Sequence, residues 1–482
     1  MQKKFTIKKN TIKVSKGYNT SSKTDAKSST VTSSSITKKS VSDDFHINII
    51  TATNIDASNY DRLKTPIYAE TMGGLIKRRR RRAVKDLTFK SAPPVPTAPK
   101  DPKVRRRQWM LSQIKSHVAL IDFPTAILSL ILAIFGVLAI YSATLTFETK
   151  SNCIVQSAGI LMGIGCALIF SIIDYRSLAS KYRYIIAINA ALLLFTYIFG
   201  SSVTEGTNSN WIDLGIIKIQ PSEFAKLLFI YSFAVHLAHV KDRMHKFMTV
   251  MSLAIHACLI FALVLLQKDL GSLTIFLVIF ISMCFAAGIS IWYYIAGASA
   301  LVCISPFIWR HLSEYQKNRI MLCFDESIDP LGQGIRYQQL RSQTAIGNGG
   351  ILGTGFTEGT VTQGISNHLP AKHTDMIFST ICEEWGFIGA LFVLTLTVML
   401  ILRVLKISRT CGNMTGCYIC IGIASMLMIQ VVENVGMCLG IMPVIGITYP
   451  FLSYGGSSVL SCFMAIGMVL SVTTHTEKTF FK

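Results

Sequence analysis

Charged residues are scarce in this sequence. Asp, Glu, Lys and Arg make up 15% of its 482 residues, whereas an ordinary soluble domain carries about 25%. Hydrophobic residues account for 51%, and the mean hydropathy of the chain is +0.46. This composition excludes a water-exposed globule, a chain disordered throughout, a collagen and a small disulfide-stabilised protein. It is typical of a polytopic membrane protein with a soluble extension.

Sequence signatures of several kinds of chemistry are absent as well. The start, MQKKFTIKKN, has no apolar core, so we expect no cleavable signal peptide. Most of the twelve cysteines lie singly in apolar runs, and the CxxC of Cys417 and Cys420 has no second pair beside it. No G-x-S-x-G, H-E-x-x-H or P-loop pattern occurs. Serine-triad hydrolysis, zinc hydrolysis and P-loop nucleotide binding are therefore not expected.

Positive charge is concentrated at the N-terminal end. Residues 1–117 hold 26 of the 47 Lys and Arg residues and 8 of the 26 acidic ones, so they carry +18 of the total net charge of +21. They are rich in Ser, Thr and Pro and show no lasting hydrophobic period. We expect a basic, mostly disordered cytoplasmic N-terminal extension that lies on anionic lipid. Nucleic-acid binding is less favoured, because no aromatic residues are interleaved with the basic clusters.

Apolar runs of about 20 residues, long enough to cross ~30 Å of hydrocarbon, recur from residue 118 onward. Lipid offers no partner to an unpaired backbone group, so the runs predict an all-α fold, a polytopic membrane helix bundle of about ten transmembrane helices. This domain covers 118–473, and a short cytoplasmic tail, 474–482, follows it. The predicted spans are 118–143, 153–173, 184–200, 221–240, 247–266, 271–288, 290–309, 376–402, 414–439 and 451–473.

The polar breaks between the spans indicate their orientation. Lys and Arg gather before the first span and in the turns after spans two, four and eight, at 176–183, 241–246 and 403–409. Cytoplasmic loops carry such an excess, so these turns and both termini are predicted to be cytoplasmic. A long outer loop, 310–375, then lies between spans seven and eight, and such a loop on a compact bundle is usually functional.

Charged side chains near the predicted outer ends of spans are candidate site residues, because charge at a membrane boundary is costly. Glu223 and Lys226 are three residues apart and share one helix face. They form either a local ion pair or a site in which the lysine holds a phosphate. Asp269, between spans five and six, either caps the following helix or faces a substrate.

The densest group of candidates lies in residues 366–389. Lys372, His373 and Asp375 come together at the predicted start of span eight, where Asp375 either caps the helix or faces the outer mouth. Glu383 and Glu384 lie roughly 80° and 180° round a continuous helix from Asp375, so one of them is expected to share a cavity with it. The His–Asp pair does not predict a serine hydrolase, since no nucleophile elbow accompanies it.

Glycine clusters at 347–355 and 453–458 form another signature. Neither follows a strand, so neither is expected to cradle a phosphate as a P-loop does. We interpret them as backbone that closely approaches a neighbour, or that breaks a helix, beside a cavity.

Several short stretches, in this order over residues 118–473, resemble the SEDS family, the RodA and FtsW membrane glycosyltransferases of bacterial wall synthesis. Together they are far more specific than any single motif, and AIGNGG and IMPVIGI are more similar to RodA than to FtsW. The stretches are WIDLG (211–215) with IQPSEFAKL (219–227), QKDLG (267–271), GQGIRYQQLRSQTAIGNGG (332–350), LPAKHTDMIF (369–378) with EEWGFIG (383–389), and GIMPVIGITYPFLSYGGSS (440–458).

The resemblance implies a peptidoglycan glycosyltransferase that polymerises lipid II for cell-wall elongation and cell shape. In such an enzyme the 4-hydroxyl of an acceptor GlcNAc attacks the anomeric carbon of donor MurNAc with inversion, and undecaprenyl pyrophosphate leaves. Asp375 matches the family's catalytic Asp and is the implied general base. The residues implied to bind substrate are Lys226, Lys372, Glu223, Trp211, Asp269, His373, Glu383 and Ser453.

Three positions depart from the family pattern. Lys268 stands where the family usually has Pro, and Met376 replaces a common Phe. Asn210 stands where a basic residue often precedes the Trp. Asn210 matters most, because the change could remove a cation from the substrate mouth.

Other roles stay open from the sequence: an FtsW-like septal polymerase in cell division, a lipid II flippase or transporter, or a scaffold without activity. No cofactor is certain, and a divalent cation, Mg²⁺ or Mn²⁺, near the pyrophosphate is an option. The implied partners are lipid II, a class B penicillin-binding protein transpeptidase and anionic membrane lipid, and no nucleic acid. The expected location is the bacterial cytoplasmic (inner) membrane, with the active site on the outer face.

Overall fold

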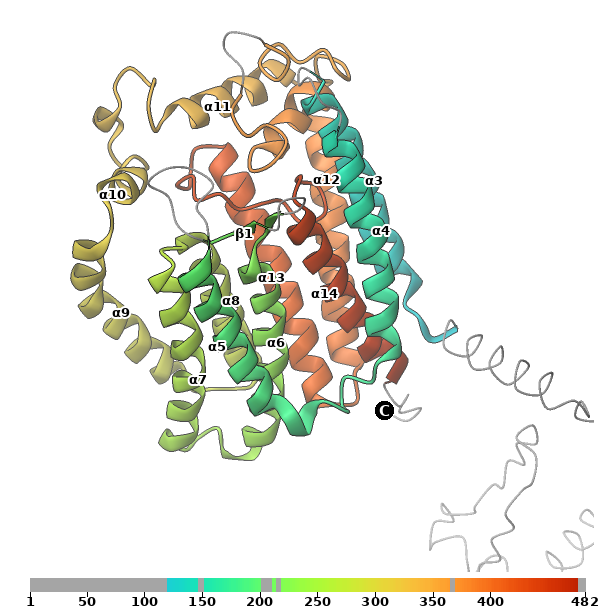
Figure 1. Cartoon of the computed structure of the whole chain (residues 1–482), viewed down its shortest axis with the longest axis vertical. Coiled ribbons are helices and arrows are strands. Elements are labelled where there is room, and N and C mark those ends of the chain that lie inside the picture. The colour runs from blue at the N-terminus through green and yellow to red at the C-terminus, as the bar shows by residue number, and fades with distance from the viewer. Residues whose placement is uncertain (1–118, 146–150, 201–209, 214–217, 365–368, 476–482) are drawn as a thin grey trace, which may run out of the picture. The chain divides into compact units, whose positions relative to one another are not determined.

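The computed structural model describes residues 119–145, 151–200, 210–213, 218–364 and 369–475. The predicted N-terminal extension, 1–117, and residues 476–482 of the predicted C-terminal tail lie outside the described residues. Helices dominate the described part (Figure 1). Its strands are one small antiparallel hairpin, β1 (Ile212–Asp213) and β2 (Lys218–Ile219). The predicted all-α class is confirmed.

Ten apolar helices correspond to the ten predicted spans. Within the described residues nine are long and apolar enough to cross a membrane, and α8 is a shorter apolar helix of 17 residues. The chain is therefore a multi-pass membrane protein. The helices are α3 (Phe123–Ala143), α4 (Ser151–Ile172), α5 (Tyr182–Phe199), α6 (Pro221–Val240), α7 (Phe247–Leu266), α8 (Leu270–Ala286), α9 (Ile291–His311), α12 (Ile377–Thr410), α13 (Met414–Cys438) and α14 (Gly456–His475).

The end of α12 differs from the prediction. The helix continues to Thr410, so the basic residues at 403–409 lie inside it and the predicted turn there is wrong. Lys and Arg are good helix formers, and their long side chains can reach polar surroundings from within a helix. Arg403 uses this reach: its Nε donates at 3.0 Å to Asp122, the residue that caps α3. α14 also begins at Gly456, five residues later than predicted.

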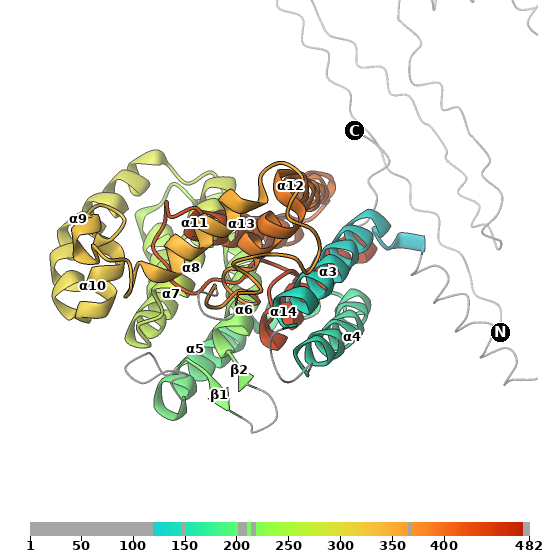
Figure 2. The ribbon, with the colours of Figure 1, turned by 90° about the horizontal axis from the view of Figure 1, so that it is seen from above.

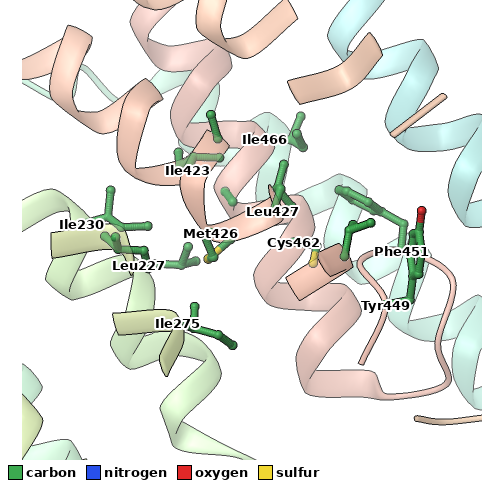
Figure 3. Close-up of a cluster of buried hydrophobic side chains, with 14 of the residues drawn as sticks. Leu227, Ile230, Ile275, Ile423, Met426, Leu427, Tyr449, Phe451, Cys462 and Ile466 are labelled. Carbon is green, nitrogen blue, oxygen red and sulfur yellow. The ribbon is translucent and has the colours of Figure 1, made fainter. Parts of the chain in front are cut away.

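Three helices, α6, α13 and α14, form the buried centre of the bundle. About three quarters of the residues in the most apolar stretch of each of these helices are buried, whereas none are buried in that of α9. Figure 3 shows side chains of this centre, among them Ile230, Ile423 and Ile466. Seen from above, α3 and α4 lie on one side of it and α7 to α9 on the other (Figure 2). α14 approaches α4 closely because Gly467 has no side chain; a Cβ there would lie 2.7 Å from the Cα of Ala167.

The connection from α9 to α12 contains two helices, α10 (Glu314–Met321) and α11 (Tyr337–Gly349), and a 3₁₀ turn at Glu326–Ile328. α10 begins with a capping box, in which Ser313 and Gln316 satisfy each other's backbone N–H groups. The segment predicted as a long loop is thus largely structured.

α12 is broken at Gly386, which has φ 65° and ψ −163°. Backbone from the glycine cluster 347–355 lies against the break: the N–H of Thr354 donates to the carbonyl of Glu383 at 2.9 Å. A Cβ on Gly386 would lie 2.4 Å from the nitrogen of Gly353. Only glycine fits this conformation and this approach at Gly386. The cluster 347–355 thus makes the close backbone contact that was predicted for it.

Candidate active site

A cavity of about 410 Å³ opens at one end of the bundle. Its lining comes from the connections α5–α6, α7–α8, α9–α12 and α13–α14 and from adjacent helix ends. Charged and aromatic side chains from all four connections meet there. They include Trp211, Lys268, Asp269, Arg319, Asp375 and Tyr454.

Asp375 presents a carboxylate to this cavity. The N-cap of α12 is Met376, and no side-chain hydrogen bond caps the helix, so the interpretation of Asp375 as a cap does not hold. Within the described residues the Asp375 carboxylate takes part in no hydrogen bond or ion pair. A Cβ on Gly446 would come within 3.6 Å of its Oδ2, so glycine leaves space beside it. Burial raises the pKa of the Asp375 carboxyl to about 6, and the positive charge of Arg319 opposes the rise.

The backbone around Asp375 is held by side chains of α13 and of the α13–α14 connection. Asn434 donates its side-chain N–H groups to the carbonyls of Asp375, at 2.8 Å, and Ile447, at 2.7 Å. Ser453 donates to the carbonyl of Thr374 at 2.7 Å. Ser453 is 1% exposed and does not line the cavity, so it fixes the position of the segment that carries the carboxylate.

Glu223 and Lys226 form a buried ion pair on α6. The Lys226 Nζ lies 2.8 Å from Oε1 of Glu223, and Ser461 donates to the other carboxylate oxygen at 2.9 Å. Neither residue lines the cavity. Lys226 instead affects Asp269, which lines the cavity. Burial raises the pKa of the Asp269 carboxyl, and hydrogen bonds from Ser272 and the charge of Lys226 oppose the rise.

Asp269 has the structural role that the sequence left open. Its carboxylate accepts hydrogen bonds from the backbone N–H of Ser272 at 2.9 Å and from the hydroxyl of Ser272 at 2.8 Å, so it caps α8. The same residue lines the cavity beside Lys268.

Lys372, Glu383 and Glu384 lie away from the cavity. Lys372 is 2% exposed and donates to the carbonyl of Thr362. Glu383 accepts the backbone N–H of Thr362 at 2.8 Å. The expectation that one glutamate shares a cavity with Asp375 is wrong, because Asp375 precedes the first helical residue and helical periodicity does not extend to it.

His373 is neutral near pH 7. Burial, together with the charge of Lys372, lowers the pKa of His373 to about 4. Its ring lies 5.5 Å from that of Tyr454, which lines the cavity, and its carbonyl accepts the N–H of Tyr454 at 2.8 Å. His373 is therefore not a cation for a phosphate group.

Arg319 is the cavity residue that sequence reasoning missed. It lies on α10, in a polar stretch where a single arginine is typical of an exposed helix face. Its guanidinium carbon lies 4.4 Å from the ring centre of Tyr315, four residues earlier. This spacing does not indicate the cavity, because Arg341 and Tyr337 share it and Arg341 does not line the cavity. Asn210 lines the same cavity. The cation expected to be lost at Asn210 therefore has counterparts in Arg319 and Lys268.

The chain matches the family model FtsW/RodA/SpoVE, described as "Cell cycle protein", over residues 124–478. One relative is the peptidoglycan glycosyltransferase MrdB of Escherichia coli strain K12, 33% identical over 73% of this chain and 93% of its own length. Another is the probable peptidoglycan glycosyltransferase FtsW of Geobacter metallireducens, 32% identical over 74% of this chain and 96% of its own.

A solved structure gives the same result. A chain in a structure titled "Structural coordination of polymerization and crosslinking by a peptidoglycan synthase complex" matches with a TM-score of 0.62 and 27% identity. The match covers 74% of this chain and 99% of that one. The protein therefore belongs to the FtsW/RodA/SpoVE family, the SEDS family that its sequence motifs predict.

Proposed function

We propose that this protein is a peptidoglycan glycosyltransferase that polymerises lipid II into glycan strands. The observation that carries the proposal is the Asp375 carboxylate, which lines a cavity at the end of a membrane bundle and has no hydrogen-bond or ion-pair partner among the described residues. The names of its relatives support the activity. The test is incubation of the purified protein with lipid II. Glycan strands are expected, and a folded protein that never makes them would refute the proposal.

Asp375 is the proposed general base. The 4-hydroxyl oxygen of the acceptor GlcNAc attacks the anomeric carbon of the donor MurNAc, and the hydroxyl proton passes to an Asp375 carboxylate oxygen. The bond from that carbon to the phosphate oxygen breaks with its electron pair, so undecaprenyl pyrophosphate leaves and the configuration inverts. With a pKa of about 6, the Asp375 carboxyl is mostly ionised at pH 7 but still basic enough to accept a proton.

Lys226 and Lys372 are proposed to act through other groups, since neither lines the cavity. The charge of Lys226 favours the ionised form of Asp269 from within the bundle, and that of its partner Glu223 opposes it. Lys372 secures the carbonyl of Thr362 in the segment that leads back toward α12. Loss of either lysine is expected to disturb the cavity wall without removing a side chain that lines the cavity.

A polymerase is favoured over a flippase by the burial of the deeper charges. Glu383, Glu384 and Glu433 are each at most 3% exposed, and the first two accept hydrogen bonds from the backbone of Thr362 and the hydroxyl of Ser142. A flippase needs polar groups that face a route through the membrane. Transport of lipid II into vesicles without polymerisation would reverse this preference.

We propose a role in elongation, as for RodA, with septal polymerisation as for FtsW as the alternative. The relatives named MrdB and FtsW share nearly the same sequence identity with the chain, 33% and 32%. The proposal therefore depends on the stretches AIGNGG and IMPVIGI, which are more similar to RodA. Depletion in the native host separates the two roles. Rounded cells are expected for elongation, and filaments would indicate division.

The proposed location is the bacterial inner membrane, with the cavity on the outer face and both termini in the cytoplasm. Residues of the α5–α6 and α7–α8 connections line the cavity, and Figure 1 shows both connections at the same end of the bundle. The basic turns 176–183 and 241–246 join helices at the opposite end, which the positive-inside rule assigns to the cytoplasm. Cysteine labelling should find 176–183 inside and 310–375 outside.

The proposed partners are lipid II, a class B penicillin-binding protein that cross-links the strands, and anionic lipid beneath the basic extension. The similar structure titled as a peptidoglycan synthase complex supports the transpeptidase. Co-purification from native membranes tests it, and recovery of the chain without any transpeptidase would count against it.

A divalent cation is proposed to accompany the pyrophosphate. Among the described residues no group of three or more His, Cys, Asp or Glu is arranged to hold a metal ion. Mg²⁺ commonly keeps several waters and binds substrate phosphates, so pyrophosphate oxygens suit it without a protein cage. Chelation should therefore lower polymerisation and leave the melting temperature unchanged.

A further inference from the structure

Of the described residues that line the cavity, two carry a positive charge, Lys268 and Arg319. Neither belongs to the set implied by the motifs to bind substrate. The two lysines of that set, Lys226 and Lys372, are buried behind the cavity wall. They are 0% and 2% exposed and do not line the cavity. A negatively charged group that enters the cavity therefore meets Arg319 and Lys268 first.

Arg319 is held over the cavity by the attachments of α10. Gln316 donates to the carbonyl of Lys268 at 3.1 Å, which ties α10 to the turn between α7 and α8. The Nη1 of Arg319 donates to the carbonyl of Val444 at 2.7 Å, which ties α10 to the α13–α14 connection. These contacts reach two of the other walls of the cavity, so the guanidinium is fixed relative to Asp375 and Asp269.

The guanidinium keeps an unused donor. Its carbon lies 4.4 Å above the ring of Tyr315, and Nη2 donates to the Tyr315 hydroxyl. Its Nε is buried and has no hydrogen-bond partner among the described residues. Asp269 is occupied by its cap on α8, and Arg319 forms no ion pair within the described part of the chain. A buried, charged N–H without a partner is costly, and an anionic oxygen would satisfy it.

We propose that Arg319 binds the pyrophosphate of the lipid-linked sugar in this cavity, beside Asp375. The inference rests on the proposed function and assigns its anion site to α10. The planar guanidinium matches phosphate oxygens in a fixed fork, which a lysine does not. Asp375 takes the proton of the attacking hydroxyl, while Arg319 stabilises the negative charge that the departing pyrophosphate oxygen receives with the electron pair of the broken bond.

The test measures binding of undecaprenyl pyrophosphate to the purified full-length protein in detergent, and polymerisation of lipid II by the same samples. Arg319→Gln should weaken binding of undecaprenyl pyrophosphate about 10- to 100-fold, the range expected for loss of a charge-assisted hydrogen bond. Arg319→Lys keeps the positive charge but loses the planar guanidinium. Its affinity for undecaprenyl pyrophosphate should lie between those of Arg319→Gln and the wild type.

Arg341→Gln is the matched control. Arg341 lies on α11 and stacks on Tyr337, also four residues earlier, with 5.2 Å from its guanidinium carbon to the ring centre. It does not line the cavity, so its loss should leave binding of undecaprenyl pyrophosphate within about twofold of the wild type.

Four results would overturn the Arg319 assignment. They are wild-type affinity in folded Arg319→Gln, equal loss in Arg341→Gln, unchanged affinity in Arg319→Lys if the Gln variant does not fold, and no binding by the wild type. Binding that depends on Arg319, without glycan strands from lipid II, would instead refute the proposed polymerase and leave the anion site standing.

Discussion

Asn434 joins two segments of the active site, and its replacement by Leu tests whether they must be held together. Its side-chain N–H groups donate to the carbonyls of Asp375 and Ile447, at 2.8 and 2.7 Å. Side-chain hydrogen bonds between membrane helices contribute about 0.6 kcal/mol on average and up to about 1.7. Two of them give about 1 to 3 kcal/mol, which corresponds to about 5- to 150-fold in rate if all of it positions the base.

The assay is steady-state polymerisation of lipid II by Asn434→Leu, with the melting temperature measured in parallel. Asn434 does not line the cavity, so kcat should fall and KM should change little. Gln430→Leu is the matched control, since Gln430 lies one turn earlier on α13 and its buried side-chain amide has no hydrogen-bond partner among the described residues. Wild-type kcat in a stable Asn434→Leu, or an equal loss in Gln430→Leu, would refute the reasoning.

Three further predictions concern other parts of the chain. Polymerisation should fall as the pH drops through about 6, because Asp375 must be ionised to act as a base; a pH–rate profile flat down to pH 5 would contradict this. Gly386→Ala should destabilise the protein by about 2 to 6 kcal/mol, because backbone strain at φ 65° and overpacking against Gly353 each cost about 1 to 3 kcal/mol. Gly347→Ala is the control, since its Cβ meets nothing within 4 Å; equal thermal stability of the two variants would count against the account. Deletion of residues 1–100 should leave polymerisation per folded molecule unchanged, and a correctly inserted but inactive truncation would assign the extension a catalytic or assembly role.

The spans were predictable because membrane length and apolar composition set them almost alone. The break at Gly386 was not, since one glycine in an apolar run does not distinguish a tolerated residue from a helix interruption. Its cause lies in the backbone of 347–355, which is close in space and distant along the chain.

Site residues were predictable where their position between two spans is enough to place them at the cavity. They were less predictable where tertiary contacts determine whether the side chain reaches it. Asp375 and Asp269 line the cavity as their positions between spans suggested. Lys372 lies three residues before Asp375 on the same segment. It nevertheless donates to the carbonyl of Thr362 and does not line the cavity, because the backbone turns before α12 begins. Arg319 reaches the cavity through the docking of α10, for which no local pattern gives a signal.

The rate of polymerisation by Asp375→Asn tests the central claim most directly. The side chain neither caps α12 nor forms a hydrogen bond within the described residues, so this variant should fold and bind lipid II as the wild type does. Its rate should fall about 10²- to 10⁴-fold, the usual contribution of a general base. Asp325→Asn, an exposed carboxylate on the α9–α12 connection, should retain activity. A folded Asp375→Asn variant that polymerises lipid II at near the wild-type rate would contradict the account.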